Sequence, residues 1–257
     1  MMENKKLILV TNDDGIDAKG LKALTETVKP FGRVVVVAPA CPQSGMSHAI
    51  TVIKPIEIQK VEEGEDFVSY KCFGTPVDCV KIALNQLLDR RPDLLVSGIN
   101  HGSNSSSSVF YSGTMGAAIE GCINDVPSVG FSLLDLHPDA DFSASQHSAS
   151  RIISKVLANG LPKSICLNVN VPPVSKSEIA GIKIARQTKG LWKEEFDKHT
   201  DALGREYYWL TGNFHNNEPD ASDTDEWALK NNYVSVVPLR VDMTCYKTLD
   251  LIKNWEL

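Results

Sequence analysis

Short, continuously apolar runs alternate with helical patterns through the first two-thirds of the chain. The runs that predict strands are Leu7–Thr11, Arg33–Ala38, Leu94–Ser97, Ser128–Ser132 and Leu167–Val171. Helices are predicted at Gly20–Val28, from Thr75-Pro76 onward, at Thr114–Cys122 and at Ser143–Asn159. Strands that are apolar on both faces and separated by helices predict an α/β fold, in which helices cover both sides of a mostly parallel sheet.

Two helix ends carry local signals of their own. Thr75 can cap a helix whose first position suits Pro76 and whose first turn suits Asp78. Gly160 follows Asn159 directly and predicts the end of the helix before it.

The character of the chain changes after residue 173. Arg205–Leu210 and Tyr233–Pro238 are typical of antiparallel strands, and the acidic, Asn-rich segment Asn216–Glu226 lies between them as a loop. We interpret the tail as a β-hairpin arm followed by a short helix at Leu249–Trp255. The arm has too little mass for a core of its own, so we expect it to pack on the main domain or on another subunit.

Composition narrows the class of protein. The chain has 257 residues, of which 42% are apolar and 23% charged, as in ordinary globular proteins, which excludes a disordered, collagen-like or coiled-coil chain. We expect one domain, 1–257, with a core of about 5–185 and a C-terminal oligomerisation arm of about 186–257. The formal net charge of −6, with no Lys/Arg cluster, argues against a partner such as duplex nucleic acid but permits a small anionic substrate.

The expected location is the cytoplasm. No apolar run approaches the ~18 residues of a membrane span, and the four-residue run after the first lysines is too short for a secretion signal. The six cysteines are scattered without a C-x-x-C pair, which is typical of small buried side chains in a reduced protein.

Candidate chemistry follows the predicted strands, because ligands of such sheets bind outside the carboxyl ends of the strands. Asp13 and Asp14 follow the first strand, and two adjacent carboxylates persist there only if a cation lies between them or if both face water. The segment Asn12–Gly15 also has good turn chemistry, so a metal site and a solvated turn both remain open.

Polar side chains also follow the next strands. Ser44 is a metal ligand or stabilises its loop, and His48 is a base, a ligand or a structural hydrogen-bonding group. After the strand Leu94–Ser97 come Asn100, Asn104 and two glycines, which suit side-chain amide contacts and close backbone approach to a ligand. The segment 112–114 opens a helix, where hydroxyl and backbone N–H groups can either cap the helix or bind an anion.

Together these positions predict one site. Hard oxygen donors favour Mg²⁺, Mn²⁺ or Ca²⁺ over Zn²⁺. The donors are Asp13, Asp14, Ser44 and Asn100. A divalent cation beside an anion-binding helix start indicates phosphate-ester chemistry.

Five motifs then resemble, in order, those of the SurE survival-protein family. They are VTNDDG (10–15), APxxxQSGxSHAIT (38–51), GTPVDCV (74–80), VSGINHGSN (96–104) and YSGTMGAAIEG (111–121). RQTKGLW (186–192) and REYYWLTG (205–212) are similar to the family's C-terminal region. The resemblance implies a metal-dependent 5′/3′-nucleotidase with a Rossmann-like core, whose C-terminal region exchanges between subunits of a homodimer or homotetramer.

The resemblance also implies residue roles. It places one divalent cation per subunit, Mg²⁺ or Mn²⁺, with Ca²⁺ as a substitute in crystals, on Asp13, Asp14, Ser44 and Asn100. The phosphate-binding positions that it implies are Asn104, Ser112, Gly113 and Thr114. Two departures bear on nucleotide preference: Ala40 replaces the family's usual Asp, and Ser106–Ser108 replaces its usual Gly and acidic residues.

We therefore expect an enzyme that hydrolyses nucleoside 5′- (and 3′-) monophosphates to nucleoside and phosphate, with short polyphosphate as a further substrate that the resemblance implies. Asp13 or Asp14 would orient or deprotonate the attacking water, and His48 and His101 are candidate acids for the leaving alkoxide. One alternative is a non-catalytic nucleotide or sugar-phosphate binder. Another, a dinucleotide-dependent oxidoreductase, is disfavoured because G-x-G-x-x-G is absent and carboxylates stand where a pyrophosphate would bind.

Overall fold

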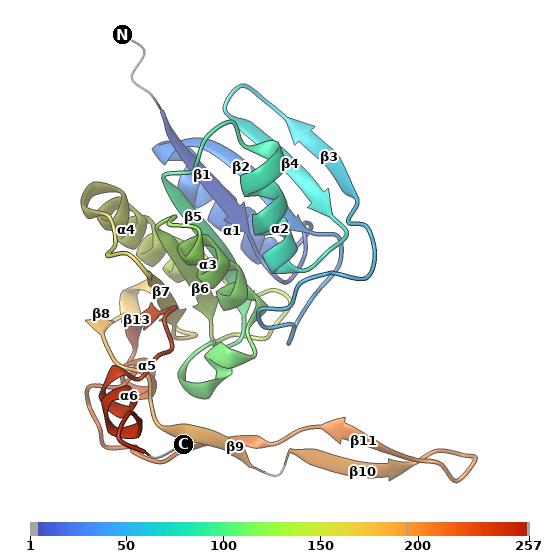
Figure 1. Cartoon of the computed structure of the whole chain (residues 1–257), viewed down its shortest axis with the longest axis vertical. Helices are drawn as coiled ribbons and strands as arrows, with labels where there is room; N and C mark the ends of the chain where they lie inside the picture. Colours follow the sequence, from blue (N-terminus) through green and yellow to red (C-terminus); the bar gives the residue numbers. More distant parts are fainter. Residues whose placement is uncertain (1–4, 194, 256–257) are drawn as a thin grey trace.

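A nine-stranded sheet forms the centre of the molecule (Figure 1), in a computed structural model that describes residues 5–193 and 195–255. In spatial order its strands are β3 (Ile58–Glu63), β4 (Phe67–Cys72), β2 (Gly32–Pro39), β1 (Lys6–Thr11), β5 (Leu94–His101), β6 (Ser128–Leu133), β7 (Ile165–Val171), β13 (Tyr233–Arg240) and β8 (Gly181–Ile184). The six strands from β4 to β7 are parallel, whereas β3 is antiparallel to β4 and β13 is antiparallel to β7. The predicted α/β class is confirmed.

Helices cover both faces of the sheet, which explains why its strands are apolar on both faces. The helices are α1 (Lys19–Val28), α2 (Pro76–Ile82), α3 (Gly113–Ile123), α4 (Ser143–Asn159), α5 (Asp225–Lys230) and α6 (Tyr246–Ile252). Short 3-10 turns lie at Lys29–Phe31, Ser106–Phe110 (η3) and Lys176–Glu178, and a π-helical turn lies at Ala83–Leu87. No helix in the described part of the chain is long and apolar enough to cross a bilayer.

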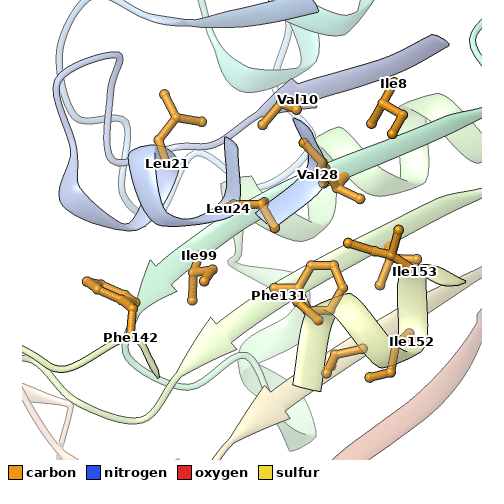
Figure 2. Close-up of a cluster of buried hydrophobic side chains, with 14 of the residues drawn as sticks. Ile8, Val10, Leu21, Leu24, Val28, Ile99, Phe131, Phe142, Ile152 and Ile153 are labelled. Carbon is orange, nitrogen blue, oxygen red and sulfur yellow. The ribbon is translucent and has the colours of Figure 1, made fainter. Parts of the chain in front are cut away.

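The alternation of side chains along β1 divides the core between the two faces. Ile8 and Val10 pack with Leu24 of α1 and Ile153 of α4, as Figure 2 shows for the cluster around Phe131. The neighbouring residues of β1 point to the other face, where they meet α2 and α3. Burial of both faces removes the apolar strands from water and stabilises the sheet, whose strand ends then hold the loops that follow them in place.

The local helix signals are confirmed. The Thr75 hydroxyl oxygen accepts a hydrogen bond from the Asp78 N–H (3.1 Å), and the Asp78 carboxylate accepts one from the Thr75 N–H (2.8 Å). This reciprocal capping box begins α2. Gly160 ends α4 with a φ of 71°, a conformation that glycine adopts without strain.

The tail differs from the expectation. The hairpin pairs β10 (Phe196–Thr200) with β11 (Glu206–Leu210), so the expected pairing of Arg205–Leu210 with Tyr233–Pro238 is wrong. The second run is β13, which lies beside β7 in the main sheet because its apolar residues are buried there. The final helix, α6, begins three residues before the expected Leu249, and β5 continues past Ser97 to His101.

The segment between β8 and β13 leaves the sheet and forms an extended arm. Its base pairs β9 (Gly190–Lys193) with β12 (Asn213–Asn216), and the β10–β11 hairpin reaches away from the core (Figure 1). The hairpin carries large exposed apolar side chains, among them Phe196, Trp209 and Leu210.

Candidate active site

The turn after β1 holds two carboxylates at the carboxyl end of the sheet. Asn12 closes the turn, because its side chain donates to the Gly15 carbonyl oxygen (3.0 Å) and accepts from the Gly15 N–H (3.2 Å). Gly15 has a φ of 100°, which favours glycine at this position. The Asp13 carbonyl oxygen accepts from the Gln43 N–H (2.7 Å), so the turn is joined to the loop after β2.

Asp13 is the most perturbed carboxylate of the site. Its residue is 4% exposed, and burial raises the pKa of its carboxyl to about 6, with a further increase from the charge of Asp14 and an opposing hydrogen bond from the Thr114 hydroxyl. Burial also raises the pKa of half-buried Asp14, whose carboxylate accepts from the His101 N–H (3.4 Å). Neither carboxylate has an ion-pair partner among the described residues.

The N-terminus of α3 lies directly against Asp13. Ser112 caps the helix, because its hydroxyl oxygen accepts from the Met115 N–H (3.0 Å). A Cβ atom at Gly113 would lie 2.8 Å from the Asp13 Cβ and 2.9 Å from its Oδ2, so only glycine permits this approach. The free N–H groups and the dipole of the first turn make this end of the helix favourable for an anion.

A cavity of about 560 Å³ opens beside these groups. It is lined by Asp13, Ser44, Gly45, Asn100, His101, Ser103, Asn104, Ser108, Tyr111, Ser112, Trp192, Glu195, Leu210, Thr211 and Gly212. Five of the eight predicted site residues are therefore in its lining. The other three lie next to Asp13: Thr114 by its hydrogen bond, Gly113 by packing and Asp14 by sequence.

The two predicted asparagines are held differently. Asn100 donates its side-chain N–H to the Gly102 carbonyl oxygen (3.0 Å), and its own amide oxygen accepts no hydrogen bond from the described residues. Asn104 is 4% exposed and donates its side-chain N–H to the Ser132 hydroxyl (2.7 Å) and its backbone N–H to Asn170 (2.8 Å). Asn100 thus keeps an oxygen free for a ligand, whereas Asn104 is tied to β6 and β7.

The donor set fits a hard divalent cation. Ser44 is exposed on the loop after β2, and its hydroxyl has no hydrogen-bond partner in the described part of the chain. Two carboxylates without a cationic partner, a free hydroxyl and a free amide oxygen are ligands that Mg²⁺ or Mn²⁺ accepts. Within the described ranges, no group of three or more His, Cys, Asp or Glu side chains could hold a metal ion.

The two candidate acids lie in different places. His48 Nε2 lies 3.2 Å from Glu120 Oε2 and lines a second cavity of about 700 Å³ between α3 and β13. Lys81 Nζ contacts the same carboxylate at 2.9 Å, so His48 belongs to a charged cluster outside the candidate site. His101 lines the site, with its Nδ1 3.1 Å from the Asp135 carbonyl oxygen.

The serine run is ordered, although its composition is typical of a mobile loop. Ser106 donates its backbone N–H to Asp225 (2.8 Å) and its hydroxyl to the Thr188 carbonyl oxygen (2.9 Å). Ser105 donates its hydroxyl to Glu226. The end of the predicted acidic loop thus begins α5 and holds η3 beside the cavity.

Sequence reasoning missed the wall that the arm contributes. Trp192, Glu195 and Leu210 line the cavity although they lie about 80 residues or more beyond the β5 motif. The aromatic content of the arm was visible in the sequence, but no local pattern indicated that it returns to the carboxyl end of the sheet.

The matches to known proteins fall in one family. The family model described as Survival protein SurE matches residues 8–194. A protein of Flavobacterium psychrophilum named 5′-nucleotidase SurE is 51% identical over 255 residues, covering 99% of this chain and 99% of that protein. A protein of the same name from Christiangramia forsetii is 52% identical over 259 residues, covering 100% and 99%. The crystal structure of the SurE protein from Aquifex aeolicus matches with a TM-score of 0.84 at 40% identity, covering 96% of this chain and 98% of that one.

Proposed function

The chain belongs to the survival protein SurE family, and from this we propose that it is a divalent-metal-dependent phosphomonoesterase that hydrolyses nucleoside 5′-monophosphates to nucleoside and phosphate. The observation that carries the proposal is the position of Asp13. It is buried, has no cationic partner among the described residues and lies against the start of α3 in a cavity. The names of the relatives support the nucleotide as substrate.

The cation would be held by Asp13, Asp14, Ser44 and Asn100. When bound, it supplies Lewis-acid polarisation of a phosphoryl oxygen and lowers the pKa of a bound water. The hydrogen bond from Thr114 fixes the Asp13 carboxylate in one orientation.

The chain's own groups account for the rest of the reaction. The Ser112 hydroxyl and the first N–H groups of α3 hold the phosphoryl oxygens, where charge accumulates in the transition state. Asp13 orients the attacking water and accepts its proton. The water oxygen bonds to phosphorus, the bond from phosphorus to the nucleoside oxygen breaks, and that oxygen takes a proton, for which His101 is the candidate acid in the lining.

The test is release of phosphate from AMP and GMP with Mn²⁺ or Mg²⁺, and with a chelator. Asp13→Asn should lower kcat/KM by more than about 10²-fold at saturating metal, because it removes the negative charge that holds the cation and orients the attacking water. Asp17→Asn changes an exposed carboxylate three residues beyond the pair and should be neutral. Full activity of Asp13→Asn would refute the assignment, and nucleotide binding without turnover would favour the non-catalytic binder. 3′-Nucleotides and short polyphosphate are further candidate substrates for the same assay.

We also propose that the arm joins subunits into a homodimer or homotetramer. Phe196, Trp209 and Leu210 are 63%, 64% and 73% exposed on the hairpin, and burying them against another subunit would remove apolar surface from water. The cytoplasm stays the predicted location.

A further inference from the structure

The candidate active-site cavity is larger than the phosphate chemistry requires. Counted at ~10–15 Å³ of cavity space for each water-sized group, a phosphoryl group and a hydrated cation need roughly 100 Å³. The cavity measures about 560 Å³, so more than half of it is left for the rest of a substrate.

Two aromatic side chains border this space. Tyr111 directly precedes Ser112 and belongs to the same lining. Trp192 of β9 enters the lining from the arm and is 37% exposed. Its indole ring meets the Phe214 ring of β12 edge-on, at 6.2 Å and 67° between the planes, and the two residues are paired across the β9–β12 ladder. Trp192 is therefore fixed in position while part of its ring remains open to the cavity.

The charges of the lining give a bound nucleotide one favourable direction. Glu195 is exposed, lines the cavity from the arm and has no ion-pair partner among the described residues. A phosphate dianion is repelled by this carboxylate and attracted by the N-terminus of α3. A neutral nucleobase suffers no such repulsion, so the base lies toward the arm and the phosphate toward Ser112.

We propose that Trp192, with Tyr111 beside it, forms a nucleobase subsite in which the base of the substrate stacks on the indole ring. The inference rests on the proposed function and adds the group that selects nucleotides from other phosphate monoesters. Every nucleobase has a flat face, so such stacking tolerates all bases and discriminates against substrates that lack one.

The subsite has a kinetic signature. In the proposed arrangement Trp192 contacts the base and contributes no group to the reacting phosphorus, so it binds the base equally in the ground state and in the transition state. Removing such an interaction raises KM and leaves kcat nearly unchanged.

The experiment compares AMP with ribose 5-phosphate, which carries the same phosphate ester without a base. Trp192→Leu should raise KM for AMP by roughly 10-fold or more, with kcat within about 2-fold, and should leave both constants for ribose 5-phosphate unchanged. Trp192→Phe keeps an aromatic face and should stay within about 3-fold of the wild type for AMP. Trp255→Leu is the matched control, because Trp255 is 64% exposed and lies outside both the cavity lining and the hairpin.

The outcomes separate the two proposals. A wild-type enzyme that releases no phosphate from nucleotides refutes the proposed function, and the subsite fails with it. A wild-type enzyme that is active on AMP and whose Trp192→Leu variant keeps the wild-type KM refutes the subsite alone. The same follows if Trp192→Leu changes AMP and ribose 5-phosphate equally, or if Trp192→Phe loses as much as Trp192→Leu.

Discussion

A single methyl group at Gly113 should disable the site while leaving the fold in place. In Gly113→Ala the new Cβ would lie 2.8 Å from the Asp13 Cβ, whereas ordinary contact begins at 3.4 Å. Asp13 must therefore retreat by at least about 0.6 Å. The Asp13 carbonyl oxygen accepts a hydrogen bond from the Gln43 N–H, and its carboxylate accepts one from the Thr114 hydroxyl. Asp13 therefore cannot move without weakening one of these hydrogen bonds.

The expected size of the effect follows from that displacement. Misplacing a reacting group by about 1 Å costs about 10²-fold in rate, so a shift of about 0.6 Å should lower kcat/KM by roughly 10- to 100-fold, or about 1.4–2.7 kcal/mol. Overpacking should reduce the free energy of unfolding by about 1–3 kcal/mol, which lowers Tm by about 3–10 °C for a chain of this size.

The assay measures phosphate release, Mn²⁺ affinity by calorimetry and Tm on the same preparation. Gly64→Ala is the control, because a Cβ there meets nothing closer than the Phe67 carbonyl oxygen at 3.9 Å. The packing argument is refuted if Gly113→Ala binds Mn²⁺ and turns over substrate as the wild type does. A variant that stays folded but loses metal affinity and turnover together supports it.

Two further predictions concern the charged cluster and the arm. The hydrogen bond from His48, aided by Lys81, lowers the pKa of buried Glu120 to about 2, so the native state stabilises the charged carboxylate by at most about 3 kcal/mol. Because the pKa of Glu120 is lower in the folded state than in the unfolded state, this stabilisation is complete above about pH 4.5 and is lost as the pH falls toward 2. Glu120→Gln should therefore lower the urea midpoint at pH 7 and lower it much less at pH 3. The control, Glu26→Gln, changes an exposed carboxylate and should leave the midpoint unchanged at both pH values. Replacing 196–210 by an Asn-Gly turn removes the exposed apolar side chains of the hairpin and should give a monomer by sedimentation velocity. The variant should stay soluble, because the Thr211 N–H donates to the Glu195 carbonyl oxygen (2.7 Å) and holds the two ends of the shortened arm together. Sedimentation at the full-length size would contradict the proposed role of the hairpin.

The elements that the sequence predicted well are those with local signals. α4 begins and ends at the predicted residues because an amphipathic pattern is closed by Gly160. The carboxyl-end rule also brought Asp13, Ser44 and Asn100 into one lining, since parallel strands end at one edge of the sheet.

The features that it missed depend on partners far away in the chain. Nothing near Tyr233–Pro238 indicates that its partner is β7, because an apolar run fits either a hairpin or a sheet. Likewise, nothing near Thr114 in the sequence indicates that its hydroxyl donates to a carboxylate 101 residues earlier in the chain, and its binding of phosphate stays a prediction. Such contacts are set by the packing of whole elements, which a single-sequence pattern does not encode.

The position of β13 determines how the arm is attached to the core. Because the chain returns from the arm to join the main sheet beside β7, the arm is an insertion tethered at both ends, not a trailing end. Its length and sequence can diverge without unravelling the core, while its two anchor points stay fixed. A wall of the candidate active-site cavity is thus carried by a segment that lies outside the core of the fold.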